Sequence, residues 1–134
     1  MQDFRKLKVW QSSHELVHAA YRASSRFPPS ETYALTGQLR RAAVSIPANV
    51  SEGCGRGSRP DFAHFLHIAM GSASEAQCLL LLARDLPYLP GDAHTALDGK
   101  AIEIKRMLTA LLKRVSPGSG GGARPGCTMP RTDN

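Results

Sequence analysis

The chain has 134 residues and a mass of 14.5 kDa, which is enough for one domain with a modest core. This size excludes most large enzyme architectures. The 17 lysines and arginines outnumber 11 aspartates and glutamates, and the net charge of +6 permits contact with phosphates or acidic surfaces without identifying a partner. Aromatic residues are only 6%, which is sparse for a protein that reads RNA by stacking.

The cysteine content and the apolar runs indicate a compartment. An odd cysteine count of three, and an N-terminus without an apolar signal-peptide stretch, argue against a disulfide scaffold. We therefore expect a cytoplasmic protein. The longest apolar run, 78–83, is far shorter than the ~18 residues of a membrane span, so no membrane contact is expected.

Composition divides the chain into two parts. Residues 116–134 are rich in glycine and proline and nearly free of apolar side chains, which predicts a flexible tail. The tail holds two arginines and one aspartate, so residues 1–115 keep 15 basic and 10 acidic residues, a net charge of +5. The basic character therefore belongs to the predicted folded domain, 1–115.

The first predicted helix runs from Leu7 to Arg26, and it ends before Pro28 because the residue preceding a proline avoids helical geometry. Its expected buried stripe is Trp10, Val17, Ala20, Tyr21 and Phe27. A second helix is predicted from Ser30, as N-cap, to Gly53. Within it, Pro47 predicts a kink or a short second piece ending at Gly53, because proline removes a helical hydrogen bond.

A third helix is predicted after the glycine-rich loop 53–57, with Ser58 or Arg59 at its cap and Pro60 in its first turn, to about Leu86. The fourth is predicted from an Asp92 cap to Val115. Four helices of similar length joined by short loops predict an all-α, antiparallel up-down four-helix bundle.

His14, Glu15 and His18 match the HExxH pattern of zinc peptidases, in which two histidines hold zinc and the glutamate activates water. A catalytic zinc needs a third protein ligand, and Tyr21 and Ser24 stand where the extended metzincin pattern has glycine and histidine. A small zinc peptidase is therefore a remote alternative. We expect no catalytic residue, metal or cofactor in this chain.

Basic residues on the second, third and fourth helices are candidate nucleic-acid contacts, although a solvated helix face has the same composition. Arg56 and Arg59, beside the glycine-rich loop, are also candidates for an anion nest at the start of the third helix. The full candidate set is Arg40, Arg41, Arg56, Arg59, Lys105, Arg106, Lys113 and Arg114.

The residues also resemble a known family. The central block Arg40–Gly53, with Asp3-Phe4, Gly55-Arg56, Asp61-Phe62 and Phe65-Leu66, is similar to the four-helix-bundle proteins encoded in intervening sequences of bacterial 23S rRNA genes. The resemblance covers residues 3 to 115. It implies an up-down bundle that assembles as a ring-shaped homopentamer, with no established enzymatic activity or cofactor.

More distant relatives are accessory proteins of diversity-generating retroelements, in which a similar basic pentamer engages reverse transcriptase and RNA. The resemblance therefore makes RNA or a reverse-transcriptase-like protein a candidate partner, besides further copies of the chain itself.

A polar stripe runs along the second predicted helix at steps of three and four residues. We expect it to form subunit contacts together with a hydrogen-bonded seam to the third helix, because polar groups at an interface need partners. The residues of this polar seam are Gln38, Arg41, Ser45, Asn49 and Glu52, with Ser72 and Glu75 on the third helix.

These observations predict a non-enzymatic, oligomeric bundle that serves as an RNA-binding accessory or scaffold factor. The alternative is a protein–protein adaptor in which the charge serves solubility. RNA binding that weakens steeply with salt separates the two hypotheses.

Overall fold

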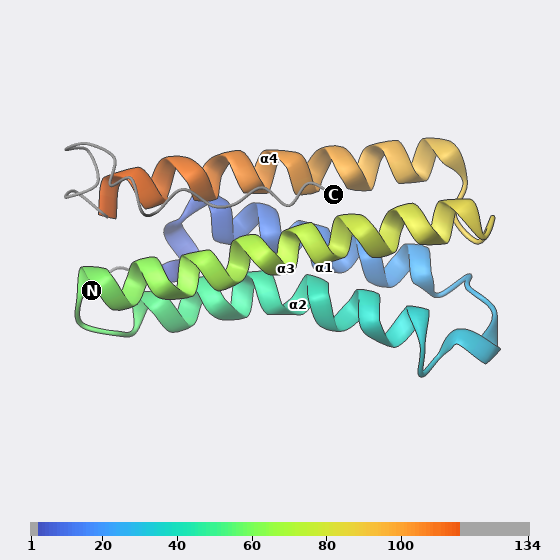
Figure 1. The fold of residues 1–134 in the computed structure, drawn as a ribbon, viewed down its shortest axis with the longest axis horizontal. Helices are drawn as coiled ribbons and strands as arrows, with labels where there is room; N and C mark the ends of the chain where they lie inside the picture. Colours follow the sequence, from blue (N-terminus) through green and yellow to red (C-terminus); the bar gives the residue numbers. More distant parts are fainter. Residues whose placement is uncertain (1–2, 116–134) are drawn as a thin grey trace, which may run out of the picture.

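A computed structural model describes residues 3–115, which form four long helices (Figure 1). No strand occurs among these residues, so the all-α prediction is confirmed. The predicted tail, 116–134, lies outside the described residues. The elements are η1 (Phe4–Lys6), α1 (Lys8–Ser24), η2 (Pro29–Glu31), α2 (Leu35–Cys54), α3 (Arg59–Asp85) and α4 (Gly91–Val115), where η marks a short 3-10 helix.

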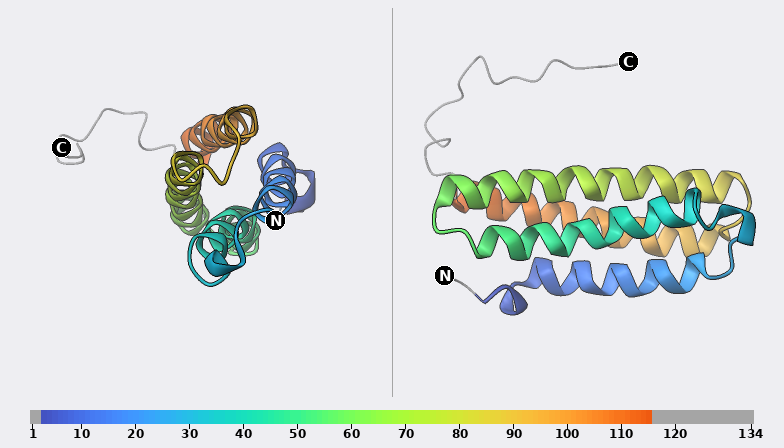
Figure 2. Two further views of the ribbon diagram at one scale, coloured as in Figure 1. Left: turned by 90° about the vertical axis from the view of Figure 1, so that its right-hand side faces the viewer. Right: turned by 90° about the horizontal axis from the view of Figure 1, so that it is seen from below.

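The four helices run alternately in opposite directions around one core (Figure 2). Each packs against its two neighbours in sequence order, and α4 closes the arrangement by packing against α1. Short connections produce this antiparallel arrangement, because the chain must reverse direction after each helix. One end of the bundle therefore holds the start of α1, the α2–α3 connection and the end of α4.

The core is made of aliphatic side chains from all four helices. Leu16, Leu39, Leu66, Leu80 and Leu108 are almost completely buried. Where α2 meets α3, both helices present alanines, which lets their backbones approach closely. These buried alanines are Ala42, Ala43, Ala69, Ala73 and Ala76.

The buried face of α1 differs from the predicted stripe. Tyr21 is 43% exposed, whereas Ser13 and Ser24 are buried. Each serine hydroxyl donates to a carbonyl one turn earlier, Ser13 to Val9 at 2.6 Å and Ser24 to Ala20 at 2.7 Å. Because serine can satisfy its hydroxyl within its own helix, it occupies core positions that a purely apolar pattern assigns to solvent.

The predicted start of α2 at Ser30 is wrong. Ser30 lies inside η2, and α2 begins only at Leu35. The side chain of Glu31 accepts a hydrogen bond from the Leu35 backbone N–H at 3.2 Å. Glu31 thus satisfies one of the open amides at the start of the helix from four residues upstream, so a serine cap is not needed.

Pro47 does not divide α2. The helix continues from Leu35 to Cys54 with Pro47 buried inside it, so the predicted alternative of a separate piece is wrong. A proline inside a helix costs about 3 kcal/mol or more. Its neighbours Ala43, Ile46 and Val50 are all buried, and we attribute the continuity of α2 to their packing.

The predicted start of α3 is confirmed, because the Ser58 hydroxyl accepts a hydrogen bond from the Asp61 backbone N–H at 3.2 Å. The 27 residues of α3 are long and apolar enough to cross a membrane by length and composition alone. One such helix is weak evidence for a membrane span, because the core helix of a bundle meets the same criteria of length and composition. Only 33% of its most apolar stretch of 18 residues is buried, and Ile68, Leu81 and Leu82 are partly exposed.

Candidate nucleic-acid interface

Basic residues gather at the end of the bundle where α1 begins and α4 ends. The ribbon in Figure 1 places these helix ends at the same end of the molecule. The basic residues come from three separate parts of the sequence: η1 with the first residue of α1, the α2–α3 connection, and the last turn of α4. We call this group the basic end, and it comprises Arg5, Lys6, Lys8, Arg56, Arg59, Lys113 and Arg114.

The basic end carries most of the net charge of the described residues. This end holds seven basic residues and three acidic ones, which gives a local net charge of +4. The acidic residues are Asp3, Glu52 and Asp61. The remaining described residues hold eight basic and seven acidic residues, a net charge of +1. The positive charge is therefore strongly polarised along the bundle axis.

Two of the three acidic groups at this end, Asp3 and Glu52, form local ion pairs. Asp3 accepts from Arg5 at 3.0 Å, and this hydrogen bond lowers the pKa of the Asp3 carboxyl. Glu52 pairs with Arg56 at 3.0 Å, one helical turn away. Both pairs are exposed, so the arginines remain in contact with water and retain donors for a further partner.

Arg56 and Arg59 lie beside a hollow of about 150 Å³ between the α2–α3 connection and the start of α3. The Arg56 guanidinium lies over the Phe65 ring, with its central carbon 5.0 Å from the ring centroid. The Cys54 thiol in the same hollow is buried, and burial raises its pKa. A protonated thiol is a poor nucleophile, so the hollow offers cationic contacts rather than thiolate chemistry.

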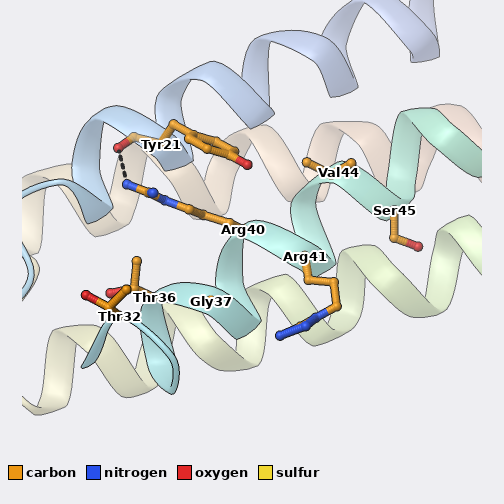
Figure 3. A pocket seen from close by; sticks show the side chains of 8 residues that line it. All are labelled: Tyr21, Thr32, Thr36, Gly37, Arg40, Arg41, Val44 and Ser45. Atoms are coloured by element: carbon orange, nitrogen blue, oxygen red, sulfur yellow. Dashed lines mark hydrogen bonds between the residues drawn. The ribbon is translucent and has the colours of Figure 1, made fainter. Parts of the chain in front are cut away.

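Arg40 and Arg41 are adjacent in sequence but point in different directions (Figure 3). Arg40 reaches α1, where its guanidinium donates to the Ser24 hydroxyl at 2.8 Å and to the Tyr21 carbonyl at 3.3 Å. Arg41 lies on the other side of an open hollow of about 570 Å³ that also contains Thr32 and Thr36. Arg40 therefore holds two helices together, whereas Arg41 is exposed.

Lys105 and Arg106 lie along α4, away from the basic end, in a hollow between α3 and α4. Lys105 donates to the Gln77 side-chain oxygen at 3.0 Å, and Gln77 in turn donates to Asp98 at 3.0 Å. The eight candidate residues thus occupy three places. Only Arg56, Arg59, Lys113 and Arg114 come together, and they are joined by three residues that sequence reasoning missed.

Arg5 and Lys6 precede the first predicted helix and Lys8 lies in its first turn, so all three are far in sequence from the other basic residues, and they were missed. A signal was present in the predicted topology. In an up-down bundle, the start of the first helix and the end of the fourth lie at the same end, so basic residues at those two places must meet.

Part of the predicted polar seam lies between α2 and α3. The hydroxyls of Ser45 and Ser72 are hydrogen-bonded at 2.7 Å, and the Asn49 amide donates to Ser45 at 2.9 Å. Gln38, Arg41 and Glu75 line a hollow of about 290 Å³ beside this contact. The Arg41 and Glu75 side chains form no ion pair within the described residues, whereas Glu52 pairs with Arg56.

The HExxH residues do not form a three-ligand metal centre. Glu15 accepts from Lys100 of α4 at 2.6 Å, and this hydrogen bond lowers the pKa of the Glu15 carboxyl. No group of three histidine, cysteine or acidic side chains in residues 3–115 is placed to hold a metal ion. His14 and His18 do lie against each other, with their Nε2 atoms 3.2 Å apart.

The chain is thus a small four-helix bundle with one basic end. The sequence profile of the 23S rRNA-intervening sequence protein family matches residues 5–110, and the chain belongs to this family. No functionally curated protein matches the chain.

A solved structure from Bacteroides thetaiotaomicron, described as a protein of unknown function from the S23 ribosomal protein family, has a similar fold. The two chains are 25% identical, with a TM-score of 0.71 over 78% of this chain and 98% of that one. Neither description assigns an enzymatic activity.

Proposed function

We propose that this protein is a non-enzymatic RNA-binding factor that contacts phosphate groups through its basic end. The single observation that carries the proposal is the polarised charge: +4 at one end of the bundle against +1 on the rest of the described surface. Localised positive potential draws a polyanion to one face and releases its condensed counterions. The family name, which refers to an rRNA gene, supports RNA as the polyanion.

We further propose that the chain assembles as the ring-shaped homopentamer implied by the family resemblance. The outer face of α3 supports an assembly, because it exposes apolar side chains such as Ile68 and Leu82 that a single chain leaves in water. In a cyclic ring, symmetry places every copy of the basic end at the same height along the axis. Five copies of the basic end carry about 20 excess positive charges in total, a field strong enough to attract RNA.

Binding of a labelled, structured RNA hairpin at several salt concentrations tests the proposed function. The double variant Lys113→Ala/Arg114→Ala removes two cations from the basic end, and Arg22→Ala/Arg26→Ala removes two exposed cations from the opposite end of α1. The two variants have equal net charge. Only the first is expected to weaken binding, and its plot of log affinity against log salt becomes shallower by about 1 to 2 units.

Equal affinities for the two variants contradict the proposal, because a general charge effect then explains any binding. Failure of the wild-type protein to bind the hairpin in a salt-dependent manner favours the second candidate function, a protein–protein adaptor. The specific observation behind that candidate is the partly exposed apolar face of α3, which suits a protein partner as well as a second copy.

A further inference from the structure

The two histidines of α1 face each other on the outside of the bundle. His14 and His18 are separated by one helical turn, both are exposed, and their Nε2 atoms lie 3.2 Å apart. Positions i and i+4 lie on the same helix face, so the backbone itself brings the two rings together. Neither residue belongs to the basic end.

We propose that His14 and His18 form a two-histidine binding site for a divalent transition-metal ion of the Ni²⁺, Cu²⁺ and Zn²⁺ group. Imidazole nitrogen is a preferred ligand for these ions. Metal–nitrogen bonds at zinc sites are about 2.0–2.1 Å long. With two nitrogens 3.2 Å apart, bonds of this length give a nitrogen–metal–nitrogen angle of about 99–106°. This angle is close to the tetrahedral value.

The aromatic neighbours hold the site in this geometry. Trp10 stacks on His14 with ring centroids 4.8 Å apart and an interplanar angle of 19°, and Phe4 in turn packs against Trp10 at 5.2 Å. The His14 ring therefore has a fixed position before an ion arrives, which reduces the ordering that binding requires. His18 meets His14 edge to face, with centroids 4.7 Å apart.

The rest of the surroundings distinguish this site from a catalytic zinc centre. The peptidase pattern assigns the role of base to Glu15, but the Glu15 carboxylate pairs with Lys100 at 2.6 Å. With two protein ligands, the ion keeps open positions for water or for a ligand from another molecule. The site is therefore one for reversible binding. Without an ion the two Nε2 atoms share a hydrogen bond, so ion binding requires both imidazoles to carry their proton on Nδ1 and to offer the Nε2 lone pair.

Trp10 is the only tryptophan in the chain and supplies a built-in probe. Titration of the purified full-length protein with NiCl₂ is expected to quench Trp10 fluorescence in a saturable manner, with one ion per chain, because paramagnetic Ni²⁺ bound to His14 lies beside the stacked indole. A large excess of ZnCl₂ is expected to displace the nickel by mass action and restore the fluorescence. Calorimetric titration with NiCl₂ gives the affinity independently of the indole.

The variant His18→Ala removes one ligand and keeps the Trp10–His14 stack. Its affinity for Ni²⁺ is expected to fall at least about tenfold, since loss of even an outer-shell partner costs that much at metal sites. The matched control is His64→Ala/His67→Ala, which removes two exposed histidines three residues apart on α3 and leaves binding unchanged. Circular dichroism confirms that each variant is folded.

Wild-type affinity in His18→Ala overturns the proposal, and so does a titration of the wild-type protein that never saturates. Equal losses in His18→Ala and in the α3 control variant also overturn it, because they indicate scattered surface binding. RNA binding is measured separately, so the proposed function stands or falls on other data.

Discussion

The guanidinium of Arg40 lies over the ring of Tyr21, with its central carbon 4.4 Å from the ring centroid. The same guanidinium donates to the Tyr21 carbonyl (Figure 3). It also donates to the Ser24 hydroxyl on α1. One side chain of α2 thereby satisfies two oxygens near the end of α1. Arg40, a candidate nucleic-acid contact by sequence, thus links two helices.

Arg40→Ala is expected to lower the free energy of unfolding by about 1–2 kcal/mol, because it removes charged hydrogen bonds and a cation–π contact. Urea denaturation followed by circular dichroism measures this change. Arg22→Ala, an exposed arginine on α1, is the control and is expected to stay within about 0.5 kcal/mol of the wild type. Equal stability of the two variants contradicts the structural role of Arg40.

Gly53 is required by close packing at the end of α2. A Cβ atom at this position would lie 2.8 Å from Cδ1 of Phe62 and 3.1 Å from Cβ of Phe65. Gly53→Ala is therefore expected to destabilise the protein by about 1–2 kcal/mol, even though alanine is the better helix former. Gly99→Ala in α4 meets nothing within 4 Å and is expected to stabilise by about 0.5–1 kcal/mol. Thermal unfolding shows whether the two shifts in midpoint have opposite signs.

Tyr88 ties the α3–α4 connection to η2, because its hydroxyl donates to Glu31 at 3.1 Å. This hydrogen bond raises the pKa of Tyr88 above its ordinary value of 10.0. The folded state then holds the tyrosine proton more tightly than the unfolded state does. The contribution of this hydrogen bond to the free energy of unfolding is therefore complete below pH 10 and is lost as the pH rises above that value.

Tyr88→Phe is accordingly expected to be less stable than the wild type at neutral pH, with the difference shrinking as the pH is raised above 10. Parallel urea titrations of the two proteins across this range measure the difference. Tyr33→Phe serves as the control, since Tyr33 is 97% exposed. If the difference in free energy of unfolding between the wild type and Tyr88→Phe grows as the pH rises, the hydrogen bond does not act as described.

Arg41→Ala is expected to weaken assembly while leaving the fold of each chain intact. Arg41 is exposed and, together with Glu75, lines the hollow of about 290 Å³ beside the Ser45–Ser72 contact. This position suits an ion pair with a neighbouring copy of the chain. Sedimentation velocity over a range of protein concentrations gives the oligomeric state, with Arg26→Ala as the control. A variant that sediments as the wild-type oligomer at every concentration removes Arg41 from the interface.

Much of the fold could be predicted because helix formation depends on local periodicity. The apolar spacing, the Ser58 cap and the proline breaks all act within a few residues, and they indicated four helices with nearly correct ends. The predicted start of α2 and the predicted break at Pro47 were wrong because contacts outside the local sequence pattern determine the structure there. Glu31 replaced the expected Ser30 cap, and packing on both sides of Pro47 held α2 together.

The four amphipathic helices, the family resemblance and the positive charge of the folded part follow from the amino-acid sequence alone, because each is a property of composition or of short-range pattern. The packing of the helices determines which basic side chains stay exposed and which contact a neighbouring helix. Arg40 and Arg41 differ by one residue, but a step of about 100° around the helix sends one to α1 and leaves the other exposed. The basic end exists because antiparallel packing brings residues 5–8, 56–59 and 113–114 to the same end of the bundle.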